Sequence, residues 1–103
     1  RLSDRRLIIG VKHLDNRVST FEFTSNGRDL IIMSFKTVVD DGRFDNIPLG
    51  HGFVCVDDEG LANVVEEYVE AGFKHYLVNG YTCIYHCELY RVVLLLEKII
   101  DSS

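Results

Sequence analysis

Three residues with metal-binding side chains, Cys83, His86 and Cys87, stand close together near the C-terminus. If that segment is helical, positions i, i+3 and i+4 share roughly one face, where two sulfurs and an imidazole could bind a soft metal ion. A structural zinc site normally needs four ligands, and the sequence offers no clear fourth one. Free cysteine is also among the most buried residue types. The cluster therefore predicts either a metal site or part of a core.

Two further histidines and an acidic loop offer less complete sites. His51 lies between two glycines, and His75 lies on a short predicted strand. Histidine binds metals and carries protons near neutral pH, but a single histidine is often structural. Asp40, Asp41 and Asp45 could bind a hard cation, but they lack the spacing of an EF-hand loop. Since no nucleophile–base pair or phosphate-binding glycine loop completes a catalytic set, we expect no catalysis by this chain alone.

The first half of the chain is expected to form antiparallel strands. Short, β-branched or alternating apolar segments cover residues 6–12, 17–24 and 30–39. The dipeptide Asn26-Gly27 favours a two-residue hairpin turn, which would pair Phe21 with Ile32. Because both faces carry apolar groups near this turn, we expect a small, mostly antiparallel β-barrel or a curled sheet.

The second half is expected to read strand–helix–strand–helix, which makes the fold class α+β. These elements cover residues 53–56, about 57–71, 74–78 and about 83–100. Asp57 or Asp58 would cap the first helix, Gly72 would end it, and Thr82 would cap the second.

The last predicted helix, residues 83–100, contains a run of consecutive apolar residues from Val92 to Leu96. A helix that is apolar all round is buried or covered by a partner. We therefore expect this helix to contact a second copy of the chain, giving a homo-oligomer, or a preceding domain. The alternative is that it lies across the sheet with one apolar flank exposed.

Length, charge and cysteine number narrow the class of protein. The 103 residues are expected to form a single domain, residues 1–103, and the net charge of −5 argues against a surface for nucleic acid or anionic membranes. No apolar run reaches the roughly 18 residues that span a bilayer. The three cysteines and the lack of a recognisable signal peptide predict a reducing, cytoplasmic location. Because the chain begins at Arg1, we expect it to be trimmed, processed or part of a longer protein.

The segment 42–79 resembles the C-terminal domain of the L-fucose/L-arabinose isomerase superfamily. The first strands match it only by their order. The residues that carry the resemblance are Gly42-Arg43-Phe44-Asp45, Pro48-Leu49, Gly52-Phe53-Val54, Tyr68, Glu70-Ala71-Gly72-Phe73-Lys74-His75 and Asn79.

That resemblance implies a small β-barrel domain that helps to close a site where a divalent metal, usually Mn²⁺, assists aldose–ketose isomerisation of a sugar. It also implies one metal-binding histidine from a His–His pair. His75 matches the first member of the pair, whereas Tyr76 replaces the second. The family's acidic metal ligands and acid/base residues lie in its preceding domain, so the resemblance implies no isomerisation by this chain alone.

Three interpretations therefore remain open. The chain is an accessory domain of a metal-dependent sugar isomerase, with His75 facing the metal or the sugar. Alternatively, it is a non-catalytic binding or assembly module that associates through its last helix. The third possibility is a small metal-binding protein that uses Cys83, His86 and Cys87.

Overall fold

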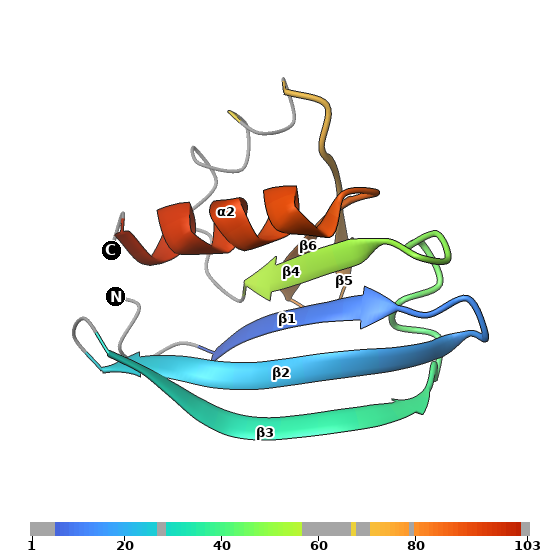
Figure 1. Cartoon of the computed structure of the whole chain (residues 1–103), viewed down its shortest axis with the longest axis horizontal. Coiled ribbons are helices and arrows are strands. Elements are labelled where there is room, and N and C mark those ends of the chain that lie inside the picture. The colour runs from blue at the N-terminus through green and yellow to red at the C-terminus, as the bar shows by residue number, and fades with distance from the viewer. Residues whose placement is uncertain (1–5, 27–28, 57–66, 68–70, 79, 102–103) are drawn as a thin grey trace.

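The structure is a computed structural model that describes residues 6–26, 29–56, 67, 71–78 and 80–101. Its named elements are six strands and one helix (Figure 1). They are β1 Arg6–Lys12, β2 Arg17–Asn26, β3 Asp29–Val39, β4 Gly52–Val56, β5 Lys74–Val78, β6 Tyr81–His86 and α2 Leu89–Asp101.

The strands form one antiparallel sheet in the order β3-β2-β1-β4-β6-β5. The sheet is open, with β3 and β5 at its two edges. Of the two predicted forms, a small β-barrel or a curled sheet, the closed barrel is therefore wrong, while the α+β class is confirmed. The helix α2 and the loop at residues 40–51 supply apolar cover for the two faces, so the sheet can bury its apolar groups without closing.

One face of the sheet packs against α2, which runs over β4 and β6 in Figure 1. The helix buries Val92, Leu95, Leu96 and Ile99, whose spacing of three and four residues forms a single stripe. This stripe packs on a group of buried sheet residues. They are Leu7, Val54, Val56 and Ile84, joined by Phe73 just before β5.

The opposite face is covered by the loop at residues 40–51, which inserts Phe44 and Ile47. Below them lie Val18, Phe53, Cys55 and Cys83, all buried. The ring of Phe53 crosses close to β1, and a Cβ at Gly10 would lie 2.6 Å from Phe53 Cζ. Only glycine therefore allows this close approach.

The predicted helix 83–100 is wrong in its first part, because Tyr81–His86 forms strand β6 and α2 begins at Leu89. Thr82 consequently lies within the strand instead of capping the helix. β6 pairs with both β4 and β5, and its tyrosines, Thr82 and Ile84 are strand-favouring residues. The backbone hydrogen bonds of these two ladders hold the segment as a strand, although the spacing of Cys83, His86 and Cys87 is typical of one face of a helix.

The predicted helix over residues 57–71 falls almost entirely outside the described residues, among which Glu67 is helical. Gly72 has φ +100°, which is the left-handed conformation expected of a glycine that ends a helix. The strand after it, β5, matches the prediction for residues 74–78.

The β2–β3 hairpin differs from its predicted register. The ladder continues to Asn26 opposite Asp29, so Asn26 belongs to the strand, and residues 27–28 lie outside the described part of the chain. Phe21 faces Phe35 instead of Ile32, because the extended ladder shifts the register by two residues and a β-bulge beside Phe23 shifts it by one more. Sequence alone gives no signal for such an extra residue.

Candidate functional site

The most extensive apolar surface lies on β3 and its neighbour β2, at the edge of the sheet. Every residue from Ile31 to Val39 is exposed, including Phe35 at 56% and Val39 at 70%. We define the β3 surface as the exposed large apolar side chains of these two strands: Phe21, Ile31, Ile32, Met33, Phe35, Val38 and Val39. At ~150 Å² or more for each large side chain, their exposed fractions amount to roughly 600 Å², divided between the two faces of the sheet.

Both faces of β3 contribute to this surface. On the face that α2 shares, the rings of Phe35 and Phe21 stack with their centroids 4.5 Å apart. On the other face Val38 lies opposite the buried Val18 of β2. Strands that are apolar on both faces are normally covered on both faces. The composition of β3 is therefore that of an inner strand, although in the described structure it lies at an edge.

The other edge strand, β5, has a different character. It begins with Lys74 and His75, both exposed, and its one strongly exposed apolar side chain is Leu77. Charged residues on an edge strand discourage pairing with another chain. Between Leu30 and Val39, β3 carries a single charged residue, Lys36. The β3 edge is thus less protected against pairing with another chain than the β5 edge.

A second candidate site lies at the end of β6, where the sequence predicts metal binding by Cys83, His86 and Cys87. The structure separates this set, because Cys83 faces β4 and is disulfide-bonded to Cys55. His86 and Cys87 remain together, and Glu88 joins them, with one ligand atom from each within 4.8 Å of the others. Glu88 was not predicted as a ligand, because a helix over residues 83–100 would place Cys83, His86 and Cys87 on one face.

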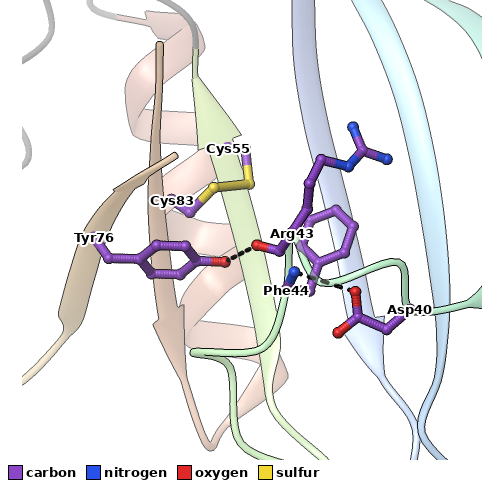
Figure 2. The surroundings of a disulfide bond; sticks show 6 residues. All are labelled: Asp40, Arg43, Phe44, Cys55, Tyr76 and Cys83. Atoms are coloured by element: carbon purple, nitrogen blue, oxygen red, sulfur yellow. Dashed lines mark hydrogen bonds between the residues drawn. A yellow bond between two sulfur atoms is a disulfide. The ribbon is translucent and has the colours of Figure 1, made fainter. Parts of the chain in front are cut away.

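The disulfide lies in the middle of the sheet, under the loop at residues 40–51 (Figure 2). Cys55 and Cys83 are direct cross-strand partners and are both buried. Their pairing contradicts the expectation of reduced cysteines for this pair, and Cys87 is the free thiol. The sequence contains no local signal for this bond, because only the pairing of β4 with β6 brings together two cysteines that are 28 positions apart.

A small apolar cavity adjoins the disulfide, and its lining includes Phe44 and Tyr81. Arg43 also lines this cavity, and its carbonyl accepts a hydrogen bond of 3.0 Å from the Tyr76 hydroxyl (Figure 2). Burial, followed by the nearby charge of Asp40, raises the pKa of Tyr76 to about 12. Tyr76 therefore stays neutral and keeps its donor proton across the physiological pH range.

The same loop is anchored at its start by an ion pair. Asp40 accepts hydrogen bonds from the N–H groups of Gly42 and Phe44, and Lys12 lies 3.5 Å from its other oxygen. Burial opposes ionisation of Asp40, but these backbone bonds and the Lys12 charge outweigh it and hold the pKa of Asp40 below its ordinary value. The carboxylate thus serves to position the loop.

His75, the residue matched to the isomerase histidine, lies exposed on β5 opposite Ile84. Its neighbour Tyr76 points to the other face of the sheet, as successive strand residues do. Within the described residues, no set of three metal-binding side chains includes His75. His75 would therefore be a single ligand from this chain, as the resemblance implies, and its role in a Mn²⁺ site stays a prediction.

Among the described residues, no helix is long and apolar enough to cross a membrane. Comparison of the chain with protein-family models, curated proteins and solved structures gave no match. The resemblance to sugar isomerases therefore stays a prediction, and functional inference depends on the surfaces described above.

Proposed function

We propose that this chain is a non-catalytic assembly module that pairs with a second copy of itself along β3. The observation that supports this proposal is the continuous exposure of residues 31–39 on an edge strand with apolar side chains on both faces. An edge strand presents unpaired backbone N–H and C=O groups, to which another strand can add. A second β3 would satisfy these groups, and its side chains would pack beside those of the first strand on both faces.

The β3 surface supplies part of the area that a dimer needs. Only Phe35, Val38 and Val39 of this surface lie in the regular part of β3, residues 34–39, and their exposed fractions amount to roughly 250 Å² at ~150 Å² for each large side chain. Stable interfaces bury about 800 Å² per partner, so backbone atoms and polar side chains of β3 must supply much of the contact. The expected interface is therefore small for a homodimer.

A two-fold axis at Thr37 gives a suitable antiparallel register. It would place Phe35 of each copy opposite Val39 of the other, and Lys36 opposite Val38. The two Lys36 ammonium groups would not oppose each other, as they would with the axis at Lys36 itself. The bulge near Met33 bends the strand, so we expect pairing to be confined to its regular part, residues 34–39.

The helix α2 offers a competing surface, since the sequence also predicts association through this element. Its outer flank exposes Leu89, Tyr90, Val93 and Leu94. The inner stripe of α2 already packs on the sheet, and its other apolar flank stays exposed. This arrangement is the second of the two alternatives that the sequence left open for this helix. This flank consists of side chains alone, whereas β3 also offers backbone groups. We therefore place the dimer contact on β3.

Sedimentation velocity of matched lysine variants tests the proposal. Phe35→Lys charges the centre of the β3 surface, Leu94→Lys charges the flank of α2, and Leu77→Lys charges the other sheet edge. Leu77 and Leu94 are exposed at 77% and 54%, so all three changes leave the core intact. We expect the unchanged chain, Leu77→Lys and Leu94→Lys to sediment as dimers and Phe35→Lys as a monomer.

Two outcomes would contradict this assignment. A monomeric unchanged chain at high micromolar concentration would remove the assembly function. A dimer that survives Phe35→Lys but is lost in Leu94→Lys would move the contact to α2. Circular dichroism of each variant shows whether the fold is retained.

The isomerase-like role, with a sugar and Mn²⁺ bound by a larger protein, stays a prediction that only the exposure of His75 supports. Its test is a His75→Ala change in the complete protein, which should weaken metal or sugar binding. Unchanged binding would remove this role. The cytoplasmic location also stays a prediction. In a reducing compartment the Cys55–Cys83 disulfide would tend to be reduced.

A further inference from the structure

The turn between β6 and α2 gathers three different metal-binding groups. His86 is the last residue of β6, Cys87 and Glu88 follow it, and α2 begins at Leu89. One ligand atom from each of the three side chains lies within 4.8 Å of the other two. Consecutive residues on a regular strand point to opposite faces, so this convergence depends on the turn.

The imidazole of His86 is already oriented toward this group. Its Nδ1 accepts a hydrogen bond of 2.9 Å from the Glu88 N–H and lies 3.8 Å from the Cys87 sulfur. Because Nδ1 accepts, its lone pair points into the turn. The ring itself is half-buried and packs on Phe73 with centroids 4.8 Å apart. A metal ion could take over this lone pair, leaving the Glu88 N–H to solvent.

The other two ligands can adjust around this fixed ring. The side chains of Cys87 and Glu88 are exposed, so small rotations bring them to the shorter ligand separations of a tetrahedral ion. Glu88 also forms an ion pair with Arg91 at 3.3 Å, but both groups are about half exposed. Such exposed pairs contribute little, so Arg91 would release the carboxylate at small cost.

The surrounding cleft can complete the coordination shell. His51, Lys74 and Tyr85 line it together with His86 and Cys87. His51 lines the cleft but lies outside the group of ligand atoms within 4.8 Å of one another, so water from the cleft would be the fourth ligand. A thiolate and a carboxylate supply two negative charges, which balance a divalent ion and exceed the opposing charge of Lys74.

We propose that His86, Cys87 and Glu88 form a binding site for a divalent transition-metal ion of the Zn²⁺ class. A nitrogen, sulfur and oxygen donor set of this kind suits Zn²⁺ better than Mg²⁺, Ca²⁺ or Mn²⁺. The site is independent of the β3 surface, because it lies at the end of β6, and neither β2 nor β3 contributes a ligand.

Titration with Co²⁺ tests the site, because thiolate-bound Co²⁺ in a four-coordinate site shows a thiolate charge-transfer band and intense visible absorption. The experiment omits reductant, so that Cys55 and Cys83 stay paired and Cys87 is the free thiol. We expect one ion per chain, displaced by Zn²⁺. Cys87→Ser should abolish the charge-transfer band, and Glu88→Gln should weaken binding about tenfold or more.

His75→Asn serves as the control, since this exposed histidine lies on β5 outside the cleft. It should leave the titration unchanged. A titration without the charge-transfer band, or one that Cys87→Ser does not alter, would overturn the proposal. One ion per two chains would also overturn it, because the ligands would then come from two copies. Cys87 is exposed, so Cys87→Ser should fold normally.

Discussion

Replacing Lys12 with methionine removes the ammonium group that joins β1 to the loop at residues 40–51. The Lys12 Nζ donates a hydrogen bond of 3.0 Å to the Phe44 carbonyl and lies 3.5 Å from Asp40. The two ionic side chains are exposed at only 7% and 1%. Methionine keeps most of the buried aliphatic length, so the change mainly leaves a buried carboxylate and a buried carbonyl without their cation.

The expected loss in the free energy of unfolding is roughly 3 kcal/mol, the lower end for removing one member of a buried ion pair. A domain of this size loses about 4–8 °C in Tm for each kcal/mol, so Tm should fall by roughly 12–24 °C. Urea unfolding followed by circular dichroism measures the free energy directly. Combining Lys12→Met with Asp40→Asn should recover at least ~1 kcal/mol, because the neutral amide needs no cation.

The pH dependence provides a second check on the same reasoning. The pKa of Asp40 is held below its ordinary value in the folded chain, so this carboxylate stabilises the fold above about pH 4 and loses that effect as pH falls. The cost of Lys12→Met should therefore be largest near pH 7 and smaller near pH 3. A loss below ~1 kcal/mol at pH 7, or a loss that does not change with pH, would refute the role given to this pair.

Two further changes probe the contact between Tyr76 and the same loop, and the disulfide. Tyr76→Phe should cost about 1 kcal/mol in urea unfolding, because the buried Arg43 carbonyl loses its 3.0 Å hydrogen bond. Since the pKa of Tyr76 is raised to about 12, its contribution should persist below about pH 10 and disappear as pH rises through 12, and a pH-independent loss would contradict this. Thiol titration of the unfolded, unreduced chain should find one free thiol, Cys87, and three would show that no disulfide had formed. Cys55→Ser paired with Cys83→Ser should lower the free energy of unfolding by about 2–4 kcal/mol.

The local signals in the sequence locate most of the strands. Residues 6–12 and 74–78 match β1 and β5 as predicted, because short β-favouring runs bounded by turns have few other solutions. The glycine stop at Gly72 also has the expected backbone conformation. These features depend on neighbouring residues, so sequence patterns capture them.

Features that depend on distant pairing were not predictable. The segment Tyr81–His86 has helical spacing of its Cys and His residues, yet it becomes an inner strand because β4 and β5 both bind it. The Cys55–Cys83 bond depends on the register of β4 and β6, and the pairing of Phe21 with Phe35 depends on a bulge between β2 and β3. For this reason the proposed metal-binding set contains Glu88 in place of Cys83.

The apolar surface on β3 was visible in the sequence but was assigned the wrong place. Its apolar residues predicted a strand with apolar groups on both faces, which suggested a small barrel or a curled sheet. The structure keeps the strand and leaves it at an open edge, with residues 31–39 exposed. The sequence therefore could not show that β3 has room for a partner.

Isotope-filtered NMR on an equal mixture of labelled and unlabelled chains tests the assembly claim most directly, because it detects only contacts between copies. Pairing about Thr37 predicts nuclear Overhauser effects from Phe35 of one copy to Val39 of the other. These signals should disappear in Phe35→Lys. A binding free energy of ~4 kcal/mol corresponds to a Kd near 1 mM, so the measurement is made at about that concentration. If no contacts between copies are detected there, the result contradicts the account. Contacts confined to Leu94 and its neighbours on α2 would contradict it as well.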